Sequence, residues 1–144
     1  ITEGFDQILW LDGQTHQYAE EAGQMNVFFR IGDEVITPEL SGTILPGVTR
    51  DSVIQLLSDW GYTVSTRQMS IQELKSASDA GILNEMFGAG TAAVIAPIQS
   101  ITLHDEELSV NAPNGPELSK RLLDTILGIQ HGTIADTHGW TVKI

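Results

Sequence analysis

The stretch from Ser41 to Gly61, SGTILPGVTRDSVIQLLSDWG, joins a loop to a predicted helix, and its backbone could bind an anion. Pro46 and Gly47 break the preceding structure, and Thr49 is expected to be the N-cap residue of the helix. A flexible glycine loop before a helix leaves several backbone N–H groups directed at one spot, where the helix dipole also favours negative charge. The stretch therefore predicts a phosphate-type site. An ordinary capped surface helix is the alternative.

Two adjacent carboxylates form the second candidate. Glu20 and Glu21 lie in the segment AEEAGQMN, between two runs that are rich in strand-forming residues. A carboxylate in this position could be directed at a positively charged ring nitrogen, because an opposite charge nearby favours the ionised form of both groups. A solvated acidic loop is the alternative.

The glycine-rich segment GAGT, Gly88 to Thr91, is the third candidate. Small residues allow a ligand to approach the backbone closely, and successive N–H groups can form an anion-binding nest. The segment is not GxGxxG and does not follow the pattern of a Rossmann dinucleotide site. A bend in a strand between packed layers is the alternative.

The other reactive side chains show no catalytic or metal-binding pattern. The four histidines lack i,i+4 or HExxH spacing and the chain has no cysteine, so a metal site is not expected. No GxSxG elbow and no P-loop is present. Lys75, Lys120 and Lys143 are not in settings typical of a nucleophilic lysine.

The elements that must hold these residues alternate loosely between strands and helices, so a mixed α and β fold is expected. Two strand-like runs around Gly32-Asp33 predict a β-hairpin. The predicted strands are 8–11 (buried), 25–31, 34–37, 62–67, a long β-prone stretch at 92–103, 108–110 and 140–144. Residues 1–4 are expected to be the tail of an element.

Three helices are predicted. The first places Val53, Ile54, Leu56, Leu57 and Trp60 on one face and ends at Gly61. The second begins with a capping box, in which the Ser70 oxygen and the Glu73 carboxylate are each expected to accept a free N–H at the helix start, and runs to about Ala80. The third has proline at its first position, Pro116, and closes near Gly132. Its apolar stripe consists of Leu118, Leu122, Ile126 and Ile129.

The composition bounds the class of protein. A chain of 144 residues with 41% hydrophobic residues is expected to form a single domain over 1–144. The net charge of −12 argues against nucleic acid and anionic membranes as partners. No signal peptide and no apolar run of membrane-spanning length is visible. Together with the absence of cysteine, this favours a cytoplasmic protein. The first residue is isoleucine, which indicates a processed chain or a piece of a longer one.

Six segments in order resemble the second half of branched-chain amino-acid aminotransferases, the fold-type IV pyridoxal-phosphate enzymes. They are ILWLDG, EEAGQMNVFF, TPELSGTILPGVTRDS, EMFGAGTAAVIAP, NGPEL and GIQHGTIADTHGW, and they extend from about Ile8 to Trp140. The resemblance implies most of a D-amino-acid-aminotransferase-like large domain, which is an incomplete pseudo-barrel of mixed strands with flanking helices. It also implies pyridoxal 5′-phosphate as the cofactor.

The resemblance assigns a role to each cofactor-binding position. Glu21, which has Gly23 and Asn26 at the matching spacing, corresponds to the glutamate that binds the protonated pyridine nitrogen. The turn Gly47-Val48-Thr49 corresponds to the phosphate cradle, and Thr91 to a residue that helps to hold the phosphate.

The backbone of Thr91 and Ala92 corresponds to the site for the substrate α-carboxylate. Animal members of the family carry a CxxC pair just after GTA, where this chain has Ala93 and Ala96. The Schiff-base lysine, the phosphate-binding arginine and the small domain of the family lie upstream of the matched region. No catalytic residue is therefore expected in this chain.

The implied function is a transaminase that moves the amino group between leucine, isoleucine or valine and 2-oxoglutarate. The chain alone is expected to be inactive and to associate as a homo-oligomer or with another chain. Two alternatives remain open. One is another fold-type IV enzyme, such as a D-amino-acid aminotransferase or aminodeoxychorismate lyase. The other is a non-enzymatic module that binds anions or protein partners.

Overall fold

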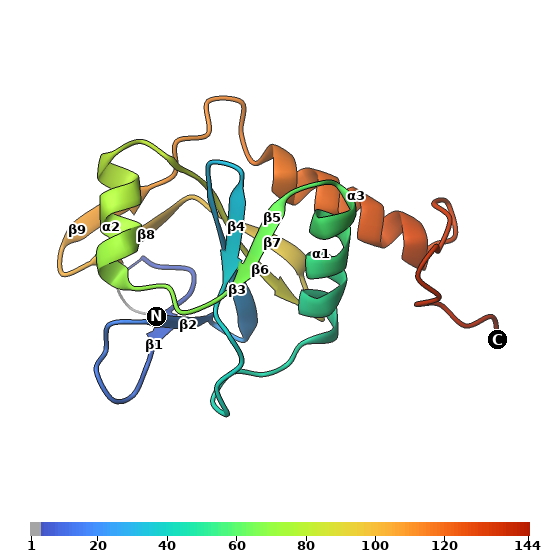
Figure 1. Cartoon of the computed structure of the whole chain (residues 1–144), viewed down its shortest axis with the longest axis horizontal. Coiled ribbons are helices and arrows are strands. Elements are labelled where there is room, and N and C mark those ends of the chain that lie inside the picture. The colour runs from blue at the N-terminus through green and yellow to red at the C-terminus, as the bar shows by residue number, and fades with distance from the viewer. Residues whose placement is uncertain (1–3) are drawn as a thin grey trace.

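The computed structural model describes residues 4–144, which form nine strands and three helices (Figure 1). The prediction for residues 1–4 lies mostly outside this range. The strands are β1 (Leu9–Leu11), β2 (Ala19–Ala22), β3 (Met25–Ile31), β4 (Glu34–Thr37), β5 (Thr63–Thr66), β6 (Leu83–Gly90), β7 (Val94–Ile98), β8 (Ser100–Leu103) and β9 (Glu106–Ser109). The helices are α1 (Val48–Asp59), α2 (Ile71–Asp79) and α3 (Glu117–Gln130).

Strand β3 is the centre of a seven-stranded mixed sheet. One of its edges pairs first with β2 and then with β4, and its other edge pairs with β6, all antiparallel. The predicted hairpin between β3 and β4 is confirmed, with Gly32 at φ 60° in the turn. β5 pairs parallel with β4, β7 pairs with β6, and β8 and β9 form a separate two-stranded sheet. This arrangement confirms the mixed α and β class.

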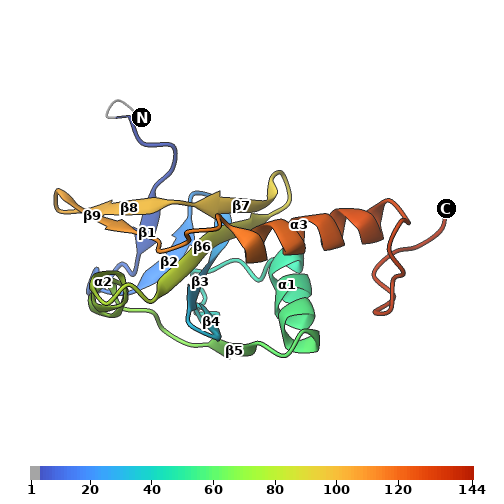
Figure 2. The same ribbon diagram turned by 90° about the horizontal axis from the view of Figure 1, so that it is seen from above.

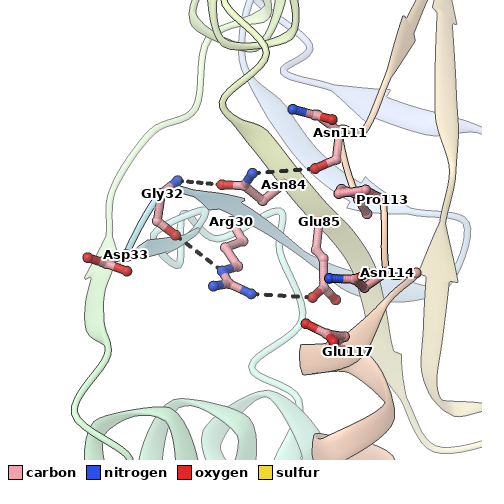
Figure 3. Close-up of a pocket in the computed structure, with 11 residues that line it drawn as sticks. Arg30, Gly32, Asp33, Asn84, Glu85, Asn111, Pro113, Asn114 and Glu117 are labelled. Atoms are coloured by element: carbon pink, nitrogen blue, oxygen red, sulfur yellow. Dashed lines mark hydrogen bonds and ion pairs between the residues drawn. The ribbon is translucent and has the colours of Figure 1, made fainter.

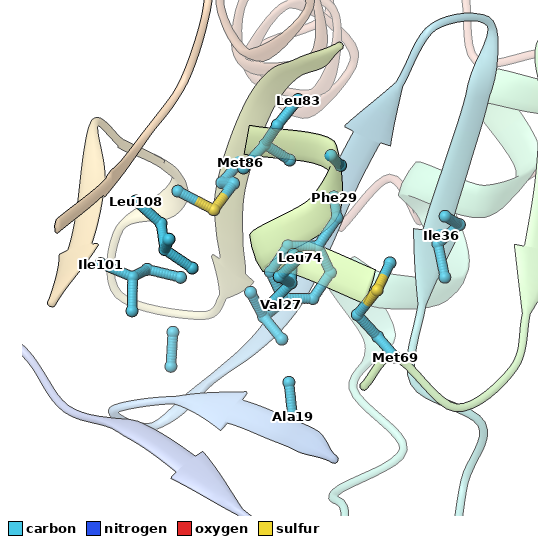
Figure 4. Packing of buried hydrophobic residues seen from close by; sticks show 12 residues of the cluster. Ala19, Val27, Phe29, Ile36, Met69, Leu74, Leu83, Met86, Ile101 and Leu108 are labelled. Atoms are coloured by element: carbon cyan, nitrogen blue, oxygen red, sulfur yellow. The ribbon is translucent and has the colours of Figure 1, made fainter. Parts of the chain in front are cut away.

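The alternating side chains of β3 enter two separate cores because successive residues of a strand point to opposite faces. Val27 and Phe29 pack with residues of α2, β6 and the β8–β9 sheet (Figure 4). Phe28 faces the other way, stacks on Phe87 with ring centroids 5.0 Å apart, and packs against residues of α1 and α3. Burial of a side chain such as Phe28 contributes about 1.5–3 kcal/mol. Figure 2 shows the result, with α2 on one side of the sheet and α1 on the other.

Helix α1 begins at Val48, and its N-cap is Gly47 rather than the predicted Thr49. Thr49 lies in the first helical turn, where its hydroxyl donates to the carbonyl oxygen of Gly90 at 3.3 Å and so is not used as a cap. The predicted buried face is confirmed for Val53, Leu56 and Leu57, and the helix ends before Gly61, which has φ 85°.

The capping box of α2 is half confirmed. The Ser70 hydroxyl accepts a hydrogen bond from the backbone N–H of Glu73 at 3.0 Å. The prediction of a return bond was wrong, because the Glu73 carboxylate instead accepts two bonds from Arg67, at 2.6 and 2.9 Å. This ion pair raises the pKa of Arg67 and lowers the pKa of Glu73. In α3 the predicted stripe is buried, while Pro116 is the N-cap residue and not the first helical residue.

Three strand predictions need correction, and so does the alternative of an acidic loop at Glu20 and Glu21. The run 8–11 forms β1, but it lies at the edge of the sheet, so Trp10 is 52% exposed and the run is not buried. Glu20 and Glu21 belong to β2 and not to a loop. The stretch 92–103 is divided, since 91–93 form a turn and Gln99 separates β7 from β8. Residues 140–144 form no strand, because no sheet edge pairs with them.

The C-terminal segment instead folds back on α1. The ring nitrogen Nε2 of His138 lies 2.7 Å from a carboxylate oxygen of Asp59, and the His138 ring stacks on Trp140. Among the described residues, none of the helices has the length and apolar character needed to cross a membrane.

Candidate functional site

The acid singled out from the sequence belongs to a row of residues that crosses the sheet. Glu21 of β2 lies opposite Asn26 of β3, and Asn26 lies opposite Ala89 of β6. Directly opposed residues of antiparallel strands have their side chains on the same face. The row therefore places Glu21, Asn26 and Ala89 of the GAGT segment on the face that α1 covers. A two-residue turn at 23–24 joins β2 to β3.

The loop between β4 and α1 is fixed to this row at Leu45. The Leu45 N–H donates to Oε1 of Glu21 at 3.1 Å, and its carbonyl oxygen accepts from Nδ2 of Asn26 at 2.8 Å. Glu20 also contacts the loop, since its carboxylate accepts from the Thr43 hydroxyl at 2.9 Å. The backbone N–H and carbonyl oxygen of Leu45 are thus bonded to two neighbouring side chains of the sheet, Glu21 and Asn26.

The start of α1 has backbone donors that could bind an anion. Within residues 4–144, no hydrogen bond is donated by the N–H of Val48 or Thr49, as is usual for the first turn of a helix. Arg50 lies in the same turn with its side chain only 5% exposed, and its guanidinium donates to the carbonyl oxygen of Pro38 at 3.2 Å. Burial lowers the pKa of Arg50, and the Asp51 carboxylate opposes this shift. The positive charge of Arg50 adds to the positive end of the helix dipole.

The hydroxyl of Thr49 brings this helix start to the end of β6. Its bond to the Gly90 carbonyl oxygen places the Gly47-Val48-Thr49 turn beside the residue that precedes Thr91. Thr91 and Ala92 are exposed in the turn that connects β6 to β7. The structure therefore brings together the turn before α1, the GAGT segment and, through Leu45, Glu21. The roles assigned to these residues stay predictions.

Asn26 belongs to this site, but the sequence patterns gave it no role of its own. Its spacing served only to identify Glu21. It is 4% exposed and bonds to the loop, in a strand whose other central residues are apolar. The signal that could have identified it is the single amide in the run MNVFFRI, because a buried polar side chain needs a partner.

A concave region lies at the opposite ends of β3 and β6, away from the start of α1 (Figure 3). It has a volume of about 290 Å³ and includes Arg30 and Glu85 in its lining. The Arg30 guanidinium lies 3.5 Å from Glu85 and donates to the Gly32 carbonyl oxygen at 3.1 Å. Asn84 accepts from the Gly32 N–H at 2.9 Å and donates to the carbonyl oxygen of Asn111.

Glu85 also fixes the start of α3, whose N-cap residue Pro116 makes no side-chain capping bond. The Glu85 carboxylate accepts from the N–H groups of Leu118 and Ser119, at 2.8 and 3.0 Å, and from the Ser119 hydroxyl at 3.0 Å. Several of the polar groups around this region thus bond to one another, which is the pattern of a structural junction. Among residues 4–144 the donors at the start of α1 have no such partners, and this favours the α1 end as the ligand site.

Comparison with known proteins identifies the family of the chain. The sequence model for the amino-transferase class IV family matches residues 1–101. Branched-chain-amino-acid aminotransferase 2 of Bacillus subtilis (strain 168) is 51% identical over 142 residues, which are 99% of this chain and 39% of that protein. The chain therefore spans about two fifths of the length of this relative.

Solved structures of similar proteins share the fold. The Escherichia coli branched-chain amino acid aminotransferase gives a TM-score of 0.76 at 29% identity, over 95% of this chain and 41% of that one. An aminotransferase from Brucella abortus, bound to the cofactor PLP, gives a TM-score of 0.68 at 29% identity. That match covers 89% of this chain and 40% of the Brucella chain.

Proposed function

Because the chain belongs to the amino-transferase class IV family, we propose that it forms the cofactor-binding part of a branched-chain-amino-acid transaminase that uses pyridoxal 5′-phosphate. The observation that carries the proposal is that one loop connects an acidic side chain to the positive end of a helix. Glu21 accepts the Leu45 N–H, and two residues beyond Leu45 the same loop becomes the N-cap of α1.

The residues fit the two ends of this cofactor. The N–H groups of Val48 and Thr49 would hold the phosphate, with Thr91 beside them, because a helix start with free donors binds anions. Glu21 would face the ring nitrogen and keep it protonated. The bound ring supplies an electron sink for the substrate carbon. The chain's own contribution is to fix the phosphate, hold the proton on the ring nitrogen and orient the ring between these two points.

The proposed substrates are leucine, isoleucine or valine and 2-oxoglutarate. The branched-chain class is supported by the names of the relatives, among them the Bacillus subtilis protein. The backbone of Thr91 and Ala92 would bind the substrate α-carboxylate, since both residues are exposed at the end of β6 next to the α1 turn. We also propose a cytoplasmic location and an oligomeric state. The oligomer would cover the exposed Trp10 at the edge of the sheet.

The proposal is tested by titrating the chain with pyridoxamine 5′-phosphate and, in parallel, with pyridoxamine. Neither compound forms a Schiff base with lysine, so the comparison isolates the contribution of the phosphate. We expect tighter binding of the phosphorylated compound by about tenfold or more, and competition by inorganic phosphate. Equal affinities would contradict the proposed cradle.

Catalysis is tested separately with pyridoxal phosphate, borohydride, and a leucine and 2-oxoglutarate assay. The three lysines of the chain lie outside the matched position of the Schiff-base lysine, so we expect no turnover and no stoichiometric reduced adduct. An adduct on Lys75, Lys120 or Lys143 together with turnover would overturn this assignment.

A further inference from the structure

We infer that Asn26 is a positioning residue that fixes the place of the phosphate-binding turn. Its amide fills the space beside Gly47, and we call this close contact the interlock. The inference rests on the proposed function, because it concerns how the Gly47-Val48-Thr49 turn is held. It assigns to Asn26 a task that its bond to Leu45 alone does not explain.

Asn26 has a fixed position in the sheet. It lies between Glu21 and Ala89 in the row across β2, β3 and β6, and it is 4% exposed. Its Nδ2 atom donates to the Leu45 carbonyl oxygen at 2.8 Å. This bond turns the other end of the amide, the Oδ1 atom, toward the backbone of Gly47.

Gly47 is a glycine for a reason other than its backbone conformation. Its φ of −66° and ψ of 140° are open to every amino acid. A Cβ atom at this position would collide with Oδ1 of Asn26. Asn26 could move aside only by giving up its bond to Leu45 inside a packed region, which would leave a buried polar group without a partner. The amide of Asn26 therefore occupies the space that a side chain at position 47 would need.

This interlock controls the two groups that the cofactor would contact. Gly47 is the residue directly before Val48 and Thr49, so a displacement of Gly47 moves both N–H groups. Hydrogen bonds weaken steeply outside a narrow range of distance and angle, and a shift of about 1 Å is enough to lose them. Because Leu45 is bonded to Glu21 as well as to Asn26, the amide also fixes the spacing between the acid and the phosphate turn.

A double-mutant cycle on the 144-residue chain tests the inference. The variants are Asn26→Ala, Gly47→Ala and the double variant, and the readout is the affinity ratio for pyridoxamine 5′-phosphate over pyridoxamine. We expect each single change to lower this ratio by about tenfold. The double variant is expected to lose no more than either single variant, because the alanine methyl group at position 47 enters the space that the amide has left.

Independent roles give a different result, since two tenfold losses then multiply to about a hundredfold. That outcome, or an unchanged ratio in Asn26→Ala, would overturn the inference. The matched control is Asn84→Ala, which removes an amide that bonds two backbone groups at the opposite end of β6. We expect the ratio to be unchanged in this control.

The cycle separates the inference from the function on which it rests. If the unaltered chain shows no preference for the phosphorylated compound, the proposed cradle is wrong and the inference falls with it. If the preference is present but the losses multiply, only the inference is wrong. Far-UV circular dichroism and thermal unfolding identify any variant that has not folded. In that case Asn26→Ser, which also empties the space beside Gly47 and adds no charge, replaces Asn26→Ala and is expected to show the same loss.

Discussion

The two ends of strands β3 and β6 carry similar residue types but use them differently. At one end, Arg30 and Glu85 bond to each other and to backbone groups of the Gly32 turn and of α3. At the other end, Glu21 and Asn26 hold a loop whose next residues leave backbone N–H groups without a partner in the described part of the chain. In the described part of the chain, the sheet thus has one end where polar groups bond to one another, the saturated end, and one end with unpaired N–H groups, the unsaturated end.

The difference separates polar residues that stabilise the fold from polar residues that are available to a ligand. A buried carboxylate with four donors, two from the backbone and two from side chains, has little capacity left for another molecule. Free donors at a helix start cost stability unless water or a ligand satisfies them. Changes at the saturated end should therefore alter stability, and changes at the other end should alter binding or catalysis.

The largest expected effect is at Glu21. In a protein that joins this chain to the lysine-bearing segment of the family, Glu21→Gln should lower kcat by about 10²–10³-fold, because a neutral amide does not keep the ring nitrogen protonated. Thermal unfolding should stay nearly unchanged. The matched control is Glu20→Gln, whose bond to Thr43 lies beside the site, and near-normal turnover in Glu21→Gln would show that the wrong carboxylate was chosen.

The substitution Glu85→Gln removes hydrogen bonds at the saturated end. The amide cannot accept from both N–H groups of α3 and also face Arg30, so we expect the free energy of unfolding to fall by about 2–4 kcal/mol. Urea unfolding measures this loss. Glu117→Gln, an exposed change in the first turn of α3, serves as the control and should cost less than about 0.5 kcal/mol. A stable Glu85→Gln variant with weakened cofactor binding would reverse the comparison of the two ends.

The link between α1 and β6 is tested by Thr49→Val. The change removes the hydroxyl that donates to Gly90 and is expected to weaken the binding of pyridoxamine 5′-phosphate by about fivefold to tenfold. Thr49→Ser keeps the hydroxyl and should bind normally. Thr125→Val, which removes a hydroxyl bonded within α3, provides a control for the loss of a hydrogen bond elsewhere. Equal binding by the valine and serine variants would show that this link is not needed.

The smallest effect concerns the C-terminal segment. Hydrogen bonds from the Thr141 backbone and its neighbours lower the pKa of Asp136 from 3.8 to about 2. The folded pKa is lower than the unfolded one, so the contribution of Asp136 is complete above about pH 4 and is lost as the pH falls toward 2. The Thr141 amide chemical shift should follow this titration by NMR. Asp136→Asn should abolish it without affecting either end of the sheet, and a midpoint near 4 would contradict the lowered pKa.

The sequence predicts those parts of the fold that depend on local spacing. The buried face of α1 and the hairpin at Gly32 follow from periodicity and from turn chemistry over a few residues. The N-cap of α1 was misplaced because the Thr49 hydroxyl is used by Gly90, which lies 41 residues further along the chain. Such a partner is visible only after the chain has folded.

The site shows the same division. The acid at Glu21 and the turn before α1 could each be identified from local patterns, and the family resemblance gave them roles. Their connection through Leu45, 24 residues from Glu21, is a tertiary contact that neither pattern contains. The capping of α3 by Glu85 was missed for the same reason, since its partners lie 33 and 34 residues away.

The turn between β2 and β3 places a constraint on how this sequence can change by insertion or deletion. Only Gly23 and Gln24 separate the paired residues Ala22 and Met25. Because strand side chains alternate between faces, one added or lost residue here would shift the pairing and turn Glu21 toward the α2 side of the sheet. Variants of this chain should therefore tolerate other residues at Gln24 but not another turn length.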